Sequence, residues 1–99
     1  MQFNFEWDPT KARMNLLKHK ISFENSAEIF LDPLAVSIYD NTQSLQEDRW
    51  ITIGKDRTGK ILLVIHTFLE QQTDLCLVRI ISARRATKNE TKQYEGESL

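Results

Sequence analysis

Two apolar stretches, Lys60–Phe68 (KILLVIHTF) and Leu75–Ser82 (LCLVRIIS), decide which fold this sequence can adopt. Each is a near-continuous aliphatic run, which is typical of strands buried on both faces of a sheet. Leu34–Tyr39 and Arg49–Gly54 precede them as shorter strand candidates, and Asp56–Gly59 is a tight turn before the first long strand. We therefore expect four consecutive strands in an antiparallel meander.

The residues before the meander predict a short strand and a helix. Gln2–Glu6 alternates phenylalanine with polar residues, which is the two-residue period of a half-buried strand. Asp8 followed by Pro9 is typical of a helix start, because aspartate caps a helix and proline fits its first position. The helix should end near residue 20. We expect its buried side chains to be Ala12, Leu16 and Leu17.

Two further helices are predicted by capping signals. Ser22 opens a short helix that ends before Pro33, because proline disfavours a helical conformation in the residue before it. Thr87 and Glu90 have the spacing at which side chains and backbone cap each other, so a last helix begins there.

Length and composition indicate one globular unit. A chain of 99 residues, 40% hydrophobic and 27% charged, has room for a single core. We expect one α+β domain over residues 1–99, with residues 95–99 as a frayed tail. The opening MQFNFEWDP lacks the basic start of a secretory segment, and no apolar run approaches the length of a membrane span. A cytoplasmic protein with no membrane contact is expected.

Charge is segregated along the chain although the net charge is only -1. Ile21–Asp48 holds six acids and no Lys or Arg, whereas Arg79–Lys92 holds five bases and one acid. Such a polarised chain can offer a cationic face to a polyanion, or its charges can simply be solvated. We find no metal-ligand spacing such as HExxH or CxxC and no phosphate-binding glycine loop, so no metal and no cofactor are expected.

Polar residues interrupt the apolar strands at two positions, and a tryptophan on a third strand also has two interpretations. His66 lies in line with Leu62 and Val64, and either forms a hydrogen-bonded core imidazole or transfers protons. Arg79 is either buried in an ion pair or exposed for function, because an unpaired buried arginine is costly. Trp50 is either a core residue or a platform on which a base stacks.

A collinear set of segments resembles the BrnT toxin family, a branch of the RelE-like ribonucleases. The matching segments are FEWDPTKARMNLLKHKISFENS, DPLAVSIYD, EDRWITIG, VIHT and RIISARRATKNETKQYE. The most specific of them are RIISAR and the stretch that follows the pattern WDPxKxxxNxxKHxxSFExA, from which this sequence departs only at the last position, where Ser26 stands.

The resemblance implies a fold, an activity and a partner. The fold would be a RelE-like sheet packed by two N-terminal helices and a C-terminal helix, with an RNA groove on the other face. The activity would be metal-independent cleavage of RNA that inhibits growth. The toxin would be neutralised by a BrnA-like antitoxin with a ribbon-helix-helix region. Operator DNA would be contacted only through that complex, within which the toxin can dimerise.

Cleavage of RNA without a metal requires a base, an acid and cations at the phosphate. Within the resemblance, we assign phosphate binding to Arg79 and Arg84, with Arg49 as a third contributor. His66 is the leading acid or base, and Ser82 hydrogen-bonds the phosphate.

Further residues receive secondary assignments. His19 and Glu24 are either second proton-transfer groups or structural residues at a helix junction. Four residues are expected to contact RNA away from the reacting phosphate: Trp50, Arg85, Lys88 and Lys20.

The last helix departs from the family pattern and keeps other functions open. Asn89, Thr91 and Gln93 stand where more bases are expected, which weakens phosphate neutralisation there. One alternative is a non-catalytic homologue that binds the antitoxin and co-regulates transcription. Another is a small enzyme acting on a phosphorylated metabolite, although such enzymes usually have a deeper pocket.

Overall fold

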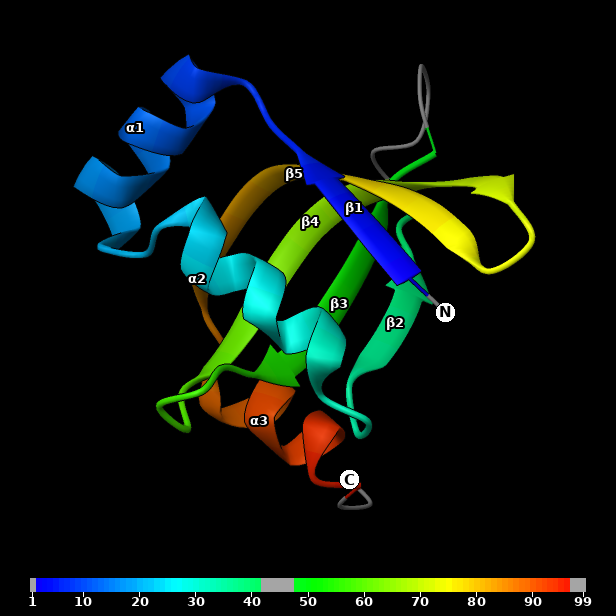
Figure 1. Ribbon diagram of the computed structural model, residues 1–99. Helices are drawn as coiled ribbons and strands as arrows, with labels where there is room; N and C mark the ends of the chain where they lie inside the picture. Colours follow the sequence, from blue (N-terminus) through cyan, green and yellow to red (C-terminus); the bar gives the residue numbers. More distant parts are fainter. Residues whose placement is uncertain (1, 42–47, 97–99) are drawn as a thin grey trace.

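One five-stranded sheet with helices on both faces forms the fold (Figure 1). The computed structural model describes residues 2–41 and 48–96. In chain order the elements are β1 (Gln2–Glu6), α1 (Pro9–His19), α2 (Phe23–Ala27), the 3₁₀ helix η1 (Glu28–Leu31), β2 (Val36–Tyr39), β3 (Trp50–Lys55), β4 (Ile61–Gln72), β5 (Leu75–Arg85) and α3 (Lys88–Tyr94).

The sheet has the order β1-β5-β4-β3-β2, and it is mixed. The consecutive strands β2 to β5 pair antiparallel, whereas β1 pairs in parallel with β5. The predicted α+β class is therefore confirmed, but the sheet is not antiparallel throughout. The two long strands also extend further than predicted, to Gln72 and Arg85.

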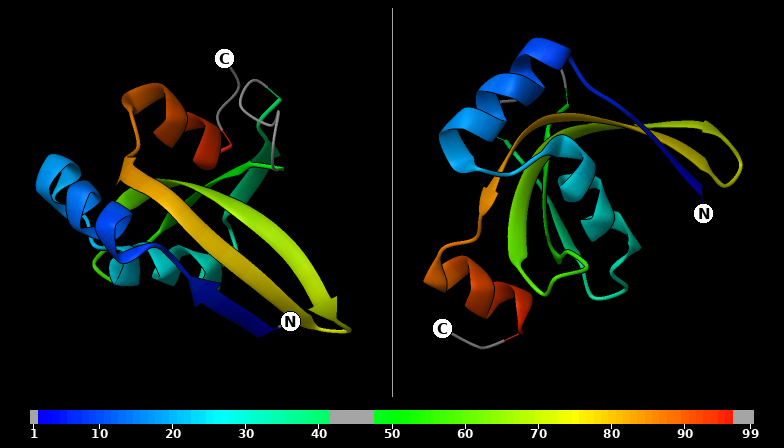
Figure 2. Two further views of the ribbon diagram at one scale, coloured as in Figure 1. Left: turned by 90° about the horizontal axis from the view of Figure 1, so that it is seen from above. Right: turned by 60° about the vertical axis from the view of Figure 1, so that its left-hand side comes forward.

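The helices lie on both faces of the sheet, although the family resemblance implied helices on one side. Figure 2 shows α2 on one side of the β4–β5 hairpin and α3 on the opposite side. The alternation of strand residues explains this division. Leu62 faces α2, whereas its neighbour Leu63 lies on the α3 face, and both are buried.

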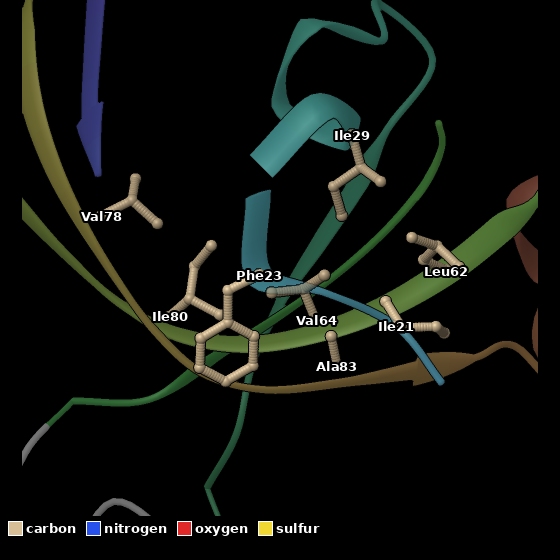
Figure 3. Close-up of a cluster of buried hydrophobic side chains, with 8 residues drawn as sticks. All are labelled: Ile21, Phe23, Ile29, Leu62, Val64, Val78, Ile80 and Ala83. Atoms are coloured by element: carbon tan, nitrogen blue, oxygen red, sulfur yellow. The ribbon is translucent and has the colours of Figure 1, made fainter. Parts of the chain in front are cut away.

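The main core lies between the sheet and the segment that contains α2 and η1 (Figure 3). Phe23 and Ile29 come from that segment and are fully buried against Val64, Val78 and Ile80 of the two long strands. Full burial of each such side chain contributes about 1.5–3 kcal/mol, so this layer supplies much of the stability.

Helix α1 begins where the sequence predicts but buries a different face. The Asp8 side chain accepts a hydrogen bond from the backbone N–H of Thr10, and Lys20 ends the helix in the left-handed conformation. Leu16 and Leu17, which we expected to be buried, are 48% and 64% exposed. The buried residue of the helix is instead a polar one, at position 15.

Asn15 holds α1 against the edge of β5. Its side-chain amide donates to the carbonyl of Ala83 at 2.9 Å, and its side-chain carbonyl accepts from the N–H of Ala83 at 3.1 Å. The same amide donates to the carbonyl of Ile21 at 3.0 Å. Strand β1 pairs with β5 only as far as Arg79, so α1 occupies the edge that β1 leaves open.

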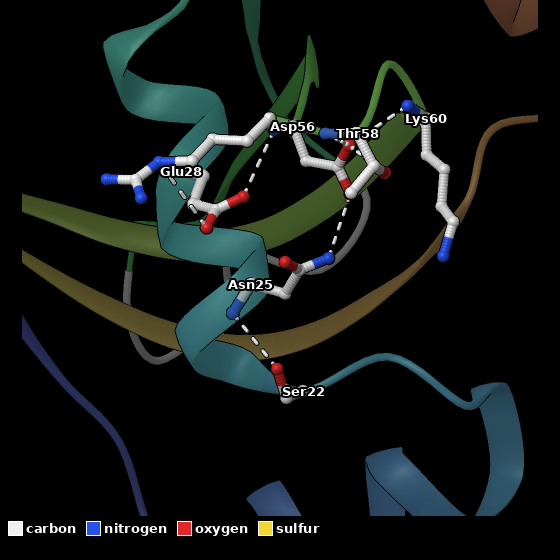
Figure 4. A network of polar contacts seen from close by, with 7 residues as sticks. Ser22, Asn25, Glu28, Asp56, Thr58 and Lys60 are labelled. Atoms are coloured by element: carbon white, nitrogen blue, oxygen red, sulfur yellow. Dashed lines mark hydrogen bonds and ion pairs between the residues drawn. The ribbon is translucent and has the colours of Figure 1, made fainter.

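A polar network joins α2 to the β3–β4 turn (Figure 4). The Asp56 carboxylate accepts from the backbone N–H groups of Thr58 and Lys60 and from the Asn25 side chain. These bonds fix the tight turn that the sequence predicts. Gly54, on β3 before the turn, allows η1 to pack closely, since a Cβ there would lie 3.0 Å from the Cβ of Ile29.

Helix α3 is fixed at both ends. Thr87 and Glu90 form the predicted capping box, and Glu90 also accepts two hydrogen bonds from Arg84, at 2.8 and 2.9 Å. At the other end, the Tyr94 hydroxyl donates to Asp32 at 2.6 Å, and this bond raises the pKa of Tyr94 to about 12.

Parts of the predicted organisation lie outside the described residues. The polar stretch between the expected strands Leu34–Tyr39 and Arg49–Gly54 includes residues 42–46, and the expected frayed tail includes residues 97–99. Within the described residues, Gly96 follows α3 with a φ of 77°, as expected of a glycine that ends a helix.

We predict that Asn15→Ala lowers the free energy of unfolding by about 2–4 kcal/mol, because it leaves buried backbone groups of Ala83 and Ile21 without their hydrogen-bond partner. Urea denaturation measures the change. Leu17→Ala, an exposed change on the same helix, is the control and should shift stability by no more than about 0.5 kcal/mol. Equal midpoints for the two variants would show that the amide does not anchor α1.

We predict a pH-dependent contribution from Glu90. Its hydrogen bonds with Arg84 lower the pKa of Glu90 from the ordinary value of 4.5 to about 2. A lowered folded-state pKa gives stability that is present above pH 4.5 and is lost as the pH falls toward 2. Because the Arg84 side chain is 38% exposed, solvent screening limits the effect to about 1 kcal/mol.

The measurement compares wild type with Glu90→Gln, which keeps a capping side chain but removes the charge. Chemical denaturation at pH 7, 4 and 2.5 should show a difference in unfolding free energy that shrinks as the pH falls. A difference that stays constant over this range would contradict the ion-pair origin.

Candidate functional site

An irregularity in β5 determines which predicted site residues share a face. In the β4–β5 pairing, Ile65 pairs with Ser82 but His66 pairs with Ile80, so Ile81 is an extra residue. Such a bulge shifts the alternation of side chains by one. Arg79 and Ser82, which simple alternation would place on opposite faces, therefore lie on the same face of the sheet.

A cleft lies between α1 and this bulge, on the edge of the sheet where Figure 1 shows α1 beside β5. Its volume is about 380 Å³. The lining side chains come from one face of the helix and from two strand residues. They are Thr10, Lys11, Met14, Asn15, Lys18, His19, Ile81 and Ser82.

The cleft is cationic and contains groups capable of proton transfer. Lys11 and Lys18 lie two helical turns apart on α1, and His19 and Ser82 also line the cleft. None of the described residues that line the cleft is acidic. The cleft therefore favours an anionic ligand and places an imidazole and a hydroxyl beside it.

Two arginines extend the cationic surface across the sheet. Arg79 is exposed and pairs with Thr67 of β4 in the strand register. Arg49 immediately precedes β3, and extending the β3–β4 register by one residue sets it on the other side of Thr67. The two arginines are thus two strand spacings apart, or roughly 10 Å, on the face that carries Ser82.

The assignment of His66 as the leading acid or base is not supported by its surroundings. The side chain is 1% exposed, and its ring packs edge-on against Phe30 with 4.9 Å between ring centroids. Nδ1 lies 2.9 Å from the carbonyl of Thr67 and must donate to it. Nε2 then accepts from the Thr52 hydroxyl at 2.6 Å.

Both ring nitrogens of His66 are therefore engaged on the face opposite to Arg79. Burial lowers the pKa of His66, partly offset by the hydrogen bond to Thr67. A buried, neutral and fully hydrogen-bonded imidazole matches the structural alternative that the sequence left open.

The predicted arginines have different surroundings. Arg79 is exposed, which rules out the alternative of a buried ion pair. Arg84 forms a bidentate pair with Glu90 and so stabilises the start of α3. Binding a phosphate through the Arg84 guanidinium would require breaking that pair, so its geometry does not favour the predicted catalytic role.

The remaining candidates are dispersed. Trp50 is half-buried, lies edge-on to Tyr39, and shares the strand face of His66 rather than that of Arg79. Arg85 pairs with Leu62, which also places it on the face opposite to Ser82. Lys20, Glu24 and Lys88 are exposed on helix ends. None of these residues lines the cleft.

Sequence reasoning missed the helical wall of the cleft. Lys11, Met14 and Lys18 recur at the spacing of one helix face, which was a usable signal. It went unused because the leucines on the same helix were assigned to the core.

In the described part of the chain, no group of three or more His, Cys, Asp or Glu side chains is arranged to hold a metal ion. Among the described helices, none is long and apolar enough to cross a membrane.

Comparison with known proteins places this fold. A family model described as "Ribonuclease toxin, BrnT, of type II toxin-antitoxin system" matches residues 7–90. The crystal structure of the Brucella abortus ribonuclease toxin BrnT aligns with a TM-score of 0.63 and 25% sequence identity, covering 88% of this chain and 100% of that one. A search of curated proteins gave no match.

The family match includes α1, the bulge in β5 and every residue that lines the cleft. This chain belongs to the BrnT family of ribonuclease toxins of type II toxin–antitoxin systems.

Proposed function

We propose that this protein cleaves RNA without a metal ion, in the cleft between α1 and β5. The observation that carries the proposal is the grouping of His19, Ser82 and two lysines around one cationic cleft. Ribose supplies its own nucleophile, so the protein needs only to move protons and neutralise the phosphate. The cleft contains groups for both tasks.

The proposed reaction follows from these groups. The imidazole of His19 accepts the proton of the ribose 2′-hydroxyl, whose oxygen attacks the adjacent phosphorus. The bond from phosphorus to the 5′-oxygen breaks, and the ammonium group of Lys11 or Lys18 gives that oxygen a proton. The products are a 2′,3′-cyclic phosphate and a 5′-hydroxyl end.

Charge neutralisation is the second part of the mechanism. One of these lysines and Arg79 stabilise the negative charge that grows on the non-bridging oxygens, and the Ser82 hydroxyl donates a hydrogen bond to one of those oxygens. Arg49, across Thr67 from Arg79, binds a neighbouring phosphate of the chain. In this scheme His66 and Arg84 stabilise the fold and do not react.

The partner and the cellular role follow the family. Type II toxins act with an antitoxin, and we propose that a BrnA-like ribbon-helix-helix antitoxin covers the cleft and so blocks RNA. Operator DNA is then contacted through the antitoxin, and any dimerisation of the toxin occurs within that complex. We further propose a cytoplasmic site of action and a RelE-like ancestry for the sheet.

We predict that His19→Gln reduces kcat for RNA cleavage by about 10²–10⁴-fold, the range expected for the loss of a general base. The assay follows single-stranded RNA with purified protein in the presence of EDTA. End analysis should identify 2′,3′-cyclic phosphates in the wild-type products.

The matched histidine control is His66→Gln, assayed at a temperature where circular dichroism shows it folded. It should retain cleavage within a few-fold of wild type. Loss of activity in folded His66→Gln together with an active His19→Gln would return the catalytic role to His66.

We also predict that Arg79→Ala abolishes growth arrest on induced expression while leaving the fold intact, because Arg79 is exposed. Its cleavage rate should fall about 10²-fold or more, as for other lost transition-state contacts. Arg57→Ala is the control, since Arg57 lies on the β3–β4 turn away from the cleft. If folded wild type causes neither arrest nor RNA loss, the alternative of a non-catalytic antitoxin-binding partner holds.

A further inference from the structure

The apolar part of the cleft is not used by the proposed reaction. Met14 is 60% exposed and Ile81 is half-buried, and the two line the cleft from opposite sides, one from α1 and one from the β5 bulge. Proton transfer and phosphate binding involve only the polar lining. An exposed methionine facing an isoleucine beside two lysines therefore needs another explanation.

We propose that this cleft is a single-nucleotide subsite, in which one unstacked RNA base inserts between Met14 and Ile81. The inference rests on the proposed function and names the part of the substrate that the cleft recognises. The thioether of Met14 contacts the face of the base, because sulfur makes favourable contacts with aromatic rings. Lys11 and Lys18 bind the phosphates on either side of that nucleotide.

The spacing of the lysines supports one nucleotide rather than an isolated anion. Lys18 lies seven residues after Lys11 on the helix, which corresponds to roughly 10 Å along the axis, and Met14 lies between them. A lone phosphate would engage only one of two ammonium groups so far apart. A nucleotide with its 5′ and 3′ phosphates offers an apolar ring in the middle and a negative charge at each end.

The size and charge of the cleft also fit this ligand class. Its volume of about 380 Å³ lies near the lower limit for small-molecule sites, which are about 300–1,000 Å³. The absence of acidic side chains from its described lining disfavours a cationic ligand. Single-stranded RNA is recognised by splaying bases out of the stack, so a shallow slot for one base suits it.

The two walls are held at a fixed separation before RNA binds. Asn15 forms three hydrogen bonds, two to Ala83 on β5 and one to Ile21, and lies within the same helix face as the lysines. Ile81, the extra residue of the bulge, precedes Ala83 by two residues on the same strand, so Asn15 is bonded close to this second wall of the cleft. A slot with both walls anchored loses little conformational entropy on binding.

The test uses Met14→Ala with Leu17→Ala as its matched control, since Leu17 is 64% exposed on α1 but does not line the cleft. The probe is a single-stranded 2′-O-methyl RNA, which binds but cannot be cleaved. Fluorescence anisotropy should show its Kd rise about three- to tenfold in Met14→Ala, the effect of losing one sulfur–ring contact. Leu17→Ala should bind as wild type does.

Kinetics on cleavable RNA give a second readout. Met14→Ala should raise KM by the same factor and leave kcat near its wild-type value, because the base contact exists before and during the reaction. A nucleoside 3′-monophosphate should compete with the RNA probe at concentrations where inorganic phosphate does not.

Three results would overturn the subsite. They are equal binding by Met14→Ala and Leu17→Ala, competition by inorganic phosphate as strong as that by the nucleotide, or a fall in kcat alone. Failure of the subsite can be distinguished from failure of the proposed function. If the proposed function is wrong, the wild-type protein does not cleave RNA, whether or not the 2′-O-methyl RNA binds at Met14.

Discussion

The pairing of the Asn15 amide with the backbone of Ala83 is the constraint on which the rest of the structure depends. Strand β1 protects only the first part of β5, and no strand among the described residues pairs with that edge beyond Arg79. An amide side chain can present a donor and an acceptor side by side as a peptide group does, so Asn15 satisfies that edge as a strand would, while its second N–H bonds Ile21. As a consequence, helix α1 lies at the position where a sixth strand could otherwise pair with β5.

This substitution of a helix for a strand creates the cleft. A strand at that edge would lie about 4.8 Å from β5 and leave no space, whereas a helix packs further out, at a distance set by its side chains. The bulge at Ile81 then turns Ser82 toward the face of Arg79. A functional site at this position needs both features, because the helix supplies lysines and an imidazole, and the bulge brings the strand residues to meet them.

The limits of prediction from sequence follow from the range of each interaction. The helix starts at Asp8 and Thr87 were predicted because a cap forms within three residues of itself. The buried face of α1 was not predicted, because Asn15 bonds a residue 68 positions away in the sequence. The leucines of the same helix were the more usual choice for buried residues. His66 was chosen for its chemistry, and only the packed structure reveals that Thr52 and Thr67 occupy both ring nitrogens.

The parallel placement of β1 and the bulge in β5 were also beyond reach, since neither has a local signal in the sequence. Their combined effect leaves the edge of β5 open to α1 and brings Ser82 into the cleft that the α1 lysines line. Arg84 is committed to Glu90, and α3 carries Asn89, Thr91 and Gln93 where bases were expected. A weakly basic α3 therefore does not imply an inactive protein, because α3 needs charge only at its capped start. The positive charge available to a polyanion comes from Lys11 and Lys18 of α1 and from Arg79. In the part of the chain that the structure describes, these three residues form no ion pair with the acids of the segment 21–48.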